Sequence, residues 1–167
     1  MKSQVERSYL EIKSLKELVE KTKPLNDLYI EKANPPDFQL NKFFYKEVGK
    51  KHRWTDRLIW SDKKWIEYLE DTRVNTYILK SNKDLIGYFE QIFYKDELDC
   101  EIAYFGILEE YIGKNLGGYL LSEAIKISFS IGSKRIWVHT CSLDHKNALK
   151  NYLSRGMKIF KTETLNL

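Results

Sequence analysis

The chain has 167 residues, of which 43% are apolar and 14% aromatic, and a formal net charge of +4; this composition excludes intrinsic disorder and linker-like repeats and suits one domain of about 100–200 residues. Its two cysteines, Cys100 and Cys141, have no further Cys or His ligands at metal-binding spacing, which argues against a disulfide framework and a metal site. The start of the sequence lacks the apolar core of a signal peptide, and no apolar run approaches the ~20 residues that cross a bilayer, so we expect a cytoplasmic protein without a membrane partner.

The first part of the chain predicts one strand and three helices. Residues 5–12 are rich in β-branched and aromatic residues, as in a strand. Ser14–Glu17 has the capping-box pattern that opens a short helix. Two longer helices are expected, one over 40–48 that Gly49 ends and one that Ser61 caps. These basic helices should cover one end of a sheet.

From residue 74 onward the pattern predicts a sheet with helical crossings. Three strands at 74–80, 85–94 and 100–108 are separated by short polar turns, which indicates an antiparallel meander. After them we expect a helix over 119–131, a strand over 135–141, a helix over 146–155 and a last strand over 157–162. The strand–helix–strand step predicts one parallel pair. The expected fold is α/β (α+β), with a mixed, mostly antiparallel sheet and helices on both faces in a single domain over 1–167.

Charge is distributed unevenly along this domain. Residues 41–57 hold six basic and two acidic residues, whereas residues 84–111 hold eight acidic residues and one lysine. Such segments predict either two separate surfaces for different partners or two solvated faces.

The turn at Ile112–Gly118 joins a predicted strand to a predicted helix and carries Gly113, Gly117 and Gly118. Glycine allows positive φ and a close approach to a bulky group. The first amides of a helix point outward at the positive end of its dipole. The turn is therefore a candidate anion site suited to a pyrophosphate, although it matches neither Walker A nor GxGxxG and a plain tight turn has the same pattern.

Further candidate catalytic residues lie between residues 139 and 152. Tyr152 lies on a predicted helix, where core packing is the usual role of a tyrosine. His139, Asp144 and His145 suggest acid–base chemistry more than a metal site. For Cys141, a buried structural thiol is favoured over a nucleophile.

Taken together and in this order, these segments resemble the GNAT superfamily of acyl-CoA-dependent N-acyltransferases. The superfamily's turn, Gln/Arg-x-x-Gly-x-Gly/Ala, falls on Ile112–Gly117, with Ile112 in place of Gln or Arg and Asn115 in place of the first Gly. Asn tolerates left-handed geometry better than other non-glycine residues, so the loop can keep its shape. The superfamily's Asn-x-x-Ala, Tyr and Gly-Phe correspond to His145–Ala148, Tyr152 and Gly156–Met157.

The resemblance covers roughly residues 74–163 and implies an acyl-CoA-binding core there, with a strand and acceptor-side helices over 1–73. In this superfamily the strand before the turn splays from the next parallel strand, and its free backbone groups bind pantetheine like an added strand. The residues implied to bind acetyl-CoA are Phe105, Gly106, Ile107, Gly113, Lys114, Asn115, Leu116, Gly117, Gly118 and Tyr152. No metal is implied.

The resemblance also implies direct attack of a neutral primary amine on the thioester of acetyl-CoA in a ternary complex. Because an alkyl amine has a pKa of ~10, a base must take its proton near neutral pH. Glu101 is the expected general base, acting through water, and Glu90 is the alternative. Tyr152 would donate a proton to the departing thiolate, backbone amides near Ile107 would stabilise the oxyanion, and His139 is a candidate proton relay.

The expected acceptor side is rich in aromatic residues, which lie within 43–49 and 52–57 and at Trp60 and Trp65. They predict either ordinary helix packing or a cage for a cation. The acidic span 84–111 favours a small-molecule or peptide amine that is cationic. A homodimer stays open as a further assembly, since two-fold pairs are the commonest oligomers.

Two alternatives compete with an acetyl-CoA-dependent N-acetyltransferase. The departures at Ile112, Asn115 and His145 leave open a non-catalytic acyl-CoA-binding module of the same fold. Basic and aromatic residues between Lys42 and Arg57 are typical of nucleic-acid binding, which weakens steeply with salt. The acidic second half of the chain disfavours nucleic acid as a partner.

Overall fold

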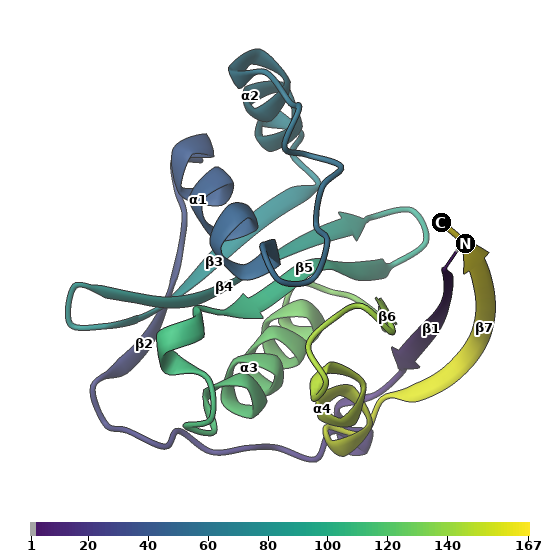
Figure 1. Cartoon of the computed structure of the whole chain (residues 1–167). Coiled ribbons are helices and arrows are strands. Elements are labelled where there is room, and N and C mark those ends of the chain that lie inside the picture. Colours follow the sequence, from purple (N-terminus) through teal and green to yellow (C-terminus); the bar gives the residue numbers. More distant parts are fainter. Residues whose placement is uncertain (1–2) are drawn as a thin grey trace.

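The computed structural model describes residues 3–167, which form one seven-stranded sheet with helices on both faces (Figure 1). The strands are β1 (Gln4–Ile12), β2 (Leu28–Lys32), β3 (Val74–Ser81), β4 (Asp84–Tyr94), β5 (Asp99–Ile107), β6 (Arg135–Cys141) and β7 (Lys158–Asn166). They lie in the order β2-β3-β4-β5-β6-β1-β7. All neighbours are antiparallel except β5 and β6. The expected mixed, mostly antiparallel sheet with one parallel step is confirmed.

The helices pack on opposite faces of this sheet (Figure 1). They are α1 (Phe38–Gly49), α2 (Asp62–Glu70), α3 (Leu116–Ser130) and α4 (Ala148–Ser154), with short 3-10 turns η1 (Leu15–Glu17) and η2 (Glu109–Tyr111). The larger apolar core lies between α3 and the sheet, around Leu120 and Ile125. A smaller core, around Phe44 and Tyr88, lies beneath α1. Among residues 3–167, no helix is long and apolar enough to cross a membrane.

Side-chain caps determine where α1 and α2 begin. Asp37 accepts hydrogen bonds from the backbone N–H groups of Gln39 and Leu40, and Ser61 accepts one from that of Lys64. The predicted cap at Ser61 is confirmed. The first long helix starts at residue 38, two residues earlier than predicted, directly after the Asp37 cap.

Two predicted helix signals act differently from expectation. The capping-box segment forms only the single 3-10 turn η1, in which Ser14 accepts from the N–H of Lys16. Gly49 is the last residue of α1, but its φ is not positive. An added Cβ there would lie 2.3 Å from Cβ of Trp54. Gly49 is thus required by close packing rather than by a left-handed cap.

The strand β2 lies outside the strands predicted from the sequence. It pairs antiparallel with β3 at the edge of the sheet, with Ile30 opposite Leu79. Only Leu28 of its five residues is buried, so the alternation that signals a strand is weak. Several boundaries also differ: α3 begins at Leu116 rather than 119, α4 spans Ala148–Ser154 rather than 146–155, and β7 spans Lys158–Asn166 rather than 157–162.

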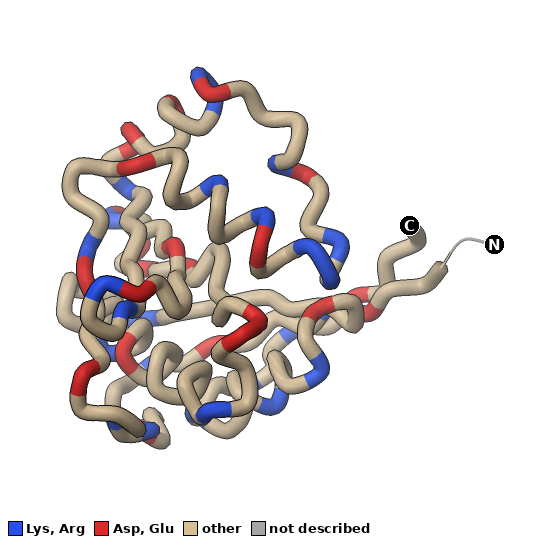
Figure 2. The backbone as a smooth tube through the Cα atoms, turned by 60° about the vertical axis from the view of Figure 1, so that its left-hand side comes forward, with Lys and Arg blue, Asp and Glu red and all other residues tan. Residues whose placement is uncertain are grey.

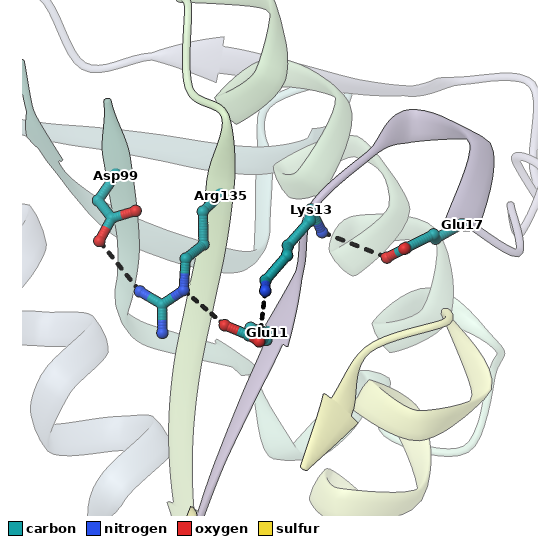
Figure 3. A network of polar contacts seen from close by, with 5 residues as sticks. All are labelled: Glu11, Lys13, Glu17, Asp99 and Arg135. Carbon is teal, nitrogen blue, oxygen red and sulfur yellow. Dashed lines mark hydrogen bonds and ion pairs between the residues drawn. The ribbon is translucent and has the colours of Figure 1, made fainter. Parts of the chain in front are cut away.

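The parallel strands β5 and β6 pair only at their start. The pairs are Asp99–Arg135, Cys100–Ile136 and Glu101–Trp137. At this closed end Arg135 contacts Asp99 at 3.0 Å and Glu11 of β1 at 2.6 Å, which ties three strands together (Figure 3). Beyond Glu101 the two strands separate. The edge of β5 over residues 102–107 therefore has no neighbouring strand on that side, as the superfamily's splay requires.

A β-bulge reorients the side chains of β5 just beyond this point. Gln91 pairs with Ile102 and Glu90 with Tyr104, which leaves Ala103 without a partner on β4. Because one residue is inserted, Glu101 and Tyr104 come to face the same side of the sheet, the side of α1.

Candidate active site

The separation of β5 and β6 opens a cleft of about 1360 Å³. Its walls come from β5, β6, the first turn of α3, α4 and the loop between α1 and α2. The predicted residues that line it are Glu101, Phe105, Gly106, Ile107, Gly113, Asn115, Leu116, Gly117, Gly118 and Tyr152. Lys114 does not line it, and its ammonium lies 5.6 Å from the ring centre of Tyr111. One cleft thus unites segments that are distant in sequence.

The first turn of α3 meets this cleft without a side-chain cap. Asn115 occupies the N-cap position with a φ of 62°, in the left-handed region, and its side chain makes no capping hydrogen bond. Gly113 also has a positive φ, of 85°. The left-handed geometry expected of Asn115 is confirmed. The first amides of α3 have no side-chain acceptor and are suited to an anion.

Tyr152 lies on α4 and packs edge-on against Phe105, with ring centres 6.3 Å apart. Its side chain lines the cleft although only 6% of the residue is exposed. Burial raises the pKa of Tyr152 above its usual value of 10.0. The phenol is therefore protonated at neutral pH, as a proton donor must be.

Glu101 is half-buried at the closed end of the cleft. The hydroxyl of Tyr94 donates a hydrogen bond to its carboxylate at 3.4 Å. Burial raises the pKa of Glu101 above its usual value of 4.5, while Tyr94 and Arg57 oppose that rise. A carboxylate with an elevated pKa in a cleft suits a general base.

Glu90, the alternative base, is fully buried and already paired. Its carboxylate accepts hydrogen bonds from the guanidinium of Arg57 at 3.0 and 3.2 Å and from the hydroxyl of Tyr68 at 2.7 Å. It does not line the cleft. Of these two carboxylates, Glu101 is therefore the one that is open to the cleft.

The aromatic residues on the expected acceptor side surround Arg57, a cation of the chain itself, so they do not leave an open cage for a cationic ligand. The guanidinium carbon of Arg57 lies 4.1 to 5.9 Å from five ring centres. The rings belong to Tyr45, Trp60, Trp65, Tyr68 and Tyr104. The rings thus hold the ion pair of Arg57 with Glu90 inside the domain, and the packing alternative is the correct one for Trp60 and Trp65.

The two oppositely charged segments do not form separate surfaces. Lys50 and Lys51 pair with Glu109, and Arg57 pairs with Glu90. Blue and red residues are interspersed along the tube in Figure 2. The basic segment 41–57 therefore packs against parts of the acidic segment and is partly neutralised by it.

His52 and Asp144 lie where the loop between α1 and α2 contacts the loop after β6. Trp54 donates a hydrogen bond from Nε1 to Asp144 at 3.2 Å, and Nδ1 of His52 lies 3.1 Å from the carbonyl oxygen of Leu143. The loop between α1 and α2 thus touches the loop after β6. His52 and Trp54 line the cleft and belong to the segment 52–57 that was expected on the acceptor side. Their contacts with residues 143–144 were not predicted, because nothing local in the sequence pairs these segments.

Asp144 and His145, which the sequence suggested for acid–base chemistry, already accept hydrogen bonds from neighbouring residues. Thr140 donates to Asp144 at 2.7 Å, and the N–H of Asn147 donates to Nδ1 of His145 at 3.1 Å. Loss of solvation and the charge of Arg7 lower the pKa of His139 from 6.5. Within residues 3–167, no three His, Cys, Asp or Glu side chains come together as a metal site.

Comparison with solved structures shows the fold. The chain is similar to a GCN5-related N-acetyltransferase from Sphaerobacter thermophilus (TM-score 0.73, 12% identity, 97% of this chain and 51% of that chain). It is also similar to one from Kribbella flavida (0.67, 13%, 95% and 56%) and to an aminoglycoside acetyltransferase from an uncultured soil metagenomic sample (0.66, 13%, 80% and 90%). The chain thus spans about half the length of the first two.

Sequence comparison gives the family. No curated protein matches the sequence. The family model described as "Acetyltransferase (GNAT) family" matches residues 37–157. This stretch contains the cleft's β5, the turn, α3, β6 and α4. Since the match covers more than half of the chain, the protein belongs to the GNAT acetyltransferase family.

Proposed function

We propose that the protein is an N-acetyltransferase that transfers the acetyl group of acetyl-CoA to a primary amine in a ternary complex. The observation that carries this proposal is the cleft where β5 and β6 part, which is lined by a carboxylate with a raised pKa, a buried tyrosine and an uncapped helix. These groups are Glu101, Tyr152 and the first turn of α3. Membership of the family supports acyl transfer.

The cleft offers matching partners to each part of acetyl-CoA. Backbone groups of β5 beyond Glu101 have no strand beside them toward β6, so they can pair with the pantetheine amides. Phe105 and Ile107 provide apolar contacts from the main core. The uncapped amides of α3 and the backbone at Gly113 suit the pyrophosphate.

The chemistry follows from the two titratable groups. Glu101 takes the amine proton, through a water molecule, as the C–N bond forms. Backbone amides near Ile107 stabilise the oxyanion of the tetrahedral intermediate. When the C–S bond breaks, the Tyr152 phenol gives its proton to the thiolate, which would otherwise be a poorer leaving group.

The acceptor in this proposal is a small-molecule or peptide amine that is cationic in solution. Glu101 supplies the negative charge that attracts it. Glu109 also lines the cleft, but its charge is met by Lys50 and Lys51. The amine would enter beside the loop between α1 and α2, where Trp54 and Tyr104 provide aromatic surface.

Calorimetric titration with acetyl-CoA and, separately, with CoA tests the cofactor site. We expect one-to-one binding of both, followed by thiol release when acetyl-CoA and a suitable amine are combined. Binding without thiol release across a wide amine panel would point to the non-catalytic acyl-CoA-binding module. Absence of binding to either compound at millimolar concentration would contradict both functions.

The pH dependence of turnover tests Glu101. Glu101→Gln should lower turnover most near neutral pH and recover partly as the pH rises, because the amine then loses its proton unaided. Glu97→Gln, in the exposed turn between β4 and β5, is the matched control. A constant ratio of wild-type to Glu101→Gln turnover across the pH range would exclude a base role.

A further inference from the structure

The connection between β1 and β2 forms an additional wall at the end of the cleft where α3 begins. The backbone N–H of Lys21 donates a hydrogen bond to the hydroxyl of Ser122 on α3 at 2.7 Å. Next to α4, Gly156 has a φ of +101°, and an added Cβ would lie 2.0 Å from the carbonyl oxygen of Glu17. This connection is therefore held against both helices that border the cleft.

The side chains of two basic residues converge on the first turn of α3. An added Cβ at Gly118 would lie 3.0 Å from Nη1 of Arg155 and 3.1 Å from Cγ of Lys21. Arg155 comes from the end of α4, whereas Lys21 comes from the β1–β2 connection. Both line the cleft. The missing side chain at Gly118 allows both side chains to lie against the first turn of α3.

These cations are not neutralised by the chain. Among residues 3–167, neither Lys21 nor Arg155 forms an ion pair with a carboxylate. Nε of Arg155 is buried and has no hydrogen-bond partner. Burial lowers the pKa of Arg155 below its usual value, and no neighbouring charge opposes that effect. A buried donor without a hydrogen-bond partner is costly, and a bound anion that accepts from it would offset that cost.

We propose that Lys21 and Arg155 bind a phosphate group of CoA, beside the first amides of α3. This inference rests on the proposed function, and it names two side chains outside the superfamily's turn. They provide positive charge inside the cleft that the turn does not, because Ile112 stands where the superfamily has Gln or Arg and Lys114 does not line the cleft. Guanidinium and ammonium groups make strong, charge-assisted hydrogen bonds to phosphate. The donor is then selected by its phosphate groups as well as by its thioester.

Calorimetry with three ligands tests the proposal and identifies the phosphate. Lys21→Gln and Arg155→Gln are each titrated with CoA, dephospho-CoA and pantetheine, beside the wild type. Lys158→Gln, on β7 and outside the cleft, removes the same charge and is the matched control. We expect each cleft variant to bind CoA about tenfold more weakly, as for one lost charge-assisted hydrogen bond. The control should bind like the wild type.

The pattern across the ligands separates the outcomes. Weakening for CoA alone assigns the 3′-phosphate, and weakening for CoA and dephospho-CoA but not pantetheine assigns the diphosphate. An equal factor for all three ligands would mean that the variants merely distort the cleft, and it would overturn the proposal. So would CoA binding as tight as that of the wild type. If the wild type itself does not bind CoA, the proposed function fails and this inference fails with it.

Discussion

The acceptor side and the cofactor side of the cleft each hold an arginine with buried atoms, but only one of the two is paired with an acidic residue. On the acceptor side, Arg57 is enclosed by aromatic rings and its charge is met by Glu90. On the cofactor side, Arg155 has a buried nitrogen without a partner, and α3 begins without a side-chain cap. Because an unpaired buried polar group costs free energy, the first arrangement avoids that cost without a ligand. The second is completed by an anionic ligand in our proposal.

The helix starts show the same contrast. Asp37 and Ser61 cap α1 and α2, whose N-termini lie away from the parting of β5 and β6. The N-terminus of α3 faces that parting and has Asn115 in a left-handed conformation instead. The N-terminus of α4, after Asn147, also lacks a side-chain cap, so both helices that border the cleft begin without one.

Removing the Arg57 charge should have the largest effect on stability. Arg57→Met leaves the fully buried carboxylate of Glu90 unpaired, and we expect the free energy of unfolding to fall by about 3–5 kcal/mol. Denaturant titration measures the change. The double variant Arg57→Met/Glu90→Met should regain much of the loss because no buried charge remains unpaired. A double variant less stable than the single one would contradict this account of the pair.

Removing the Tyr152 hydroxyl should affect chemistry rather than fold. Tyr152→Phe is expected to lower turnover about 100-fold, within the range of general acid catalysis, with little change in affinity for acetyl-CoA. Steady-state kinetics and calorimetry measure the two quantities. Tyr119→Phe alters another buried tyrosine of the same core, outside the cleft lining, and should leave turnover unchanged. Full turnover by Tyr152→Phe, with chemistry rate-limiting, would remove Tyr152 from the mechanism.

Two glycines of the cleft should respond differently to an added methyl group. At Gly106 a Cβ would lie 2.2 Å from Cγ1 of Val48, so Gly106→Ala must push α1 from β5 and should lower the free energy of unfolding by about 1–3 kcal/mol. At Gly117 the nearest atom lies at 3.6 Å, an ordinary contact. Gly117→Ala should therefore retain or gain stability through helix propensity. Equal losses in thermal unfolding would refute the distinction.

The smallest expected effect is the change in stability when the charge of Glu101 is removed. Since burial raises its pKa in the folded state above 4.5, the ionised form destabilises the fold relative to the protonated form. The free energy of unfolding carries no penalty from this site below the pKa that Glu101 has in the unfolded chain. It decreases as the pH rises through the pKa that Glu101 has in the folded protein. Glu101→Gln should thus be more stable than the wild type near pH 7 and equal to it at low pH. Unfolding titrations at both pH values measure the difference, and a gain confined to acid would contradict the sign.

Local sequence patterns were sufficient for the elements around the turn. The strand β5, α3 and the Ser61 cap follow from periodicity and from residues adjacent in sequence. The left-handed Asn115 follows from its match to a glycine of the superfamily's turn. The weakly alternating β2 did not, because its position depends on pairing with β3. The bulge at Ala103 was not predicted either, since it is defined by the register with β4.

The amino-acid sequence by itself determined the fold class, the order of the elements other than β2, and the resemblance to the family, because these depend on periodic burial and on closely spaced motifs. Only the tertiary structure decided which charges are satisfied. Arg57 meets Glu90 across 33 residues, and Lys21 meets Arg155 over Gly118 although they lie in opposite ends of the chain. Such meetings depend on strand register and helix packing, so no local pattern encodes whether a cation is neutralised within the domain or left to a ligand.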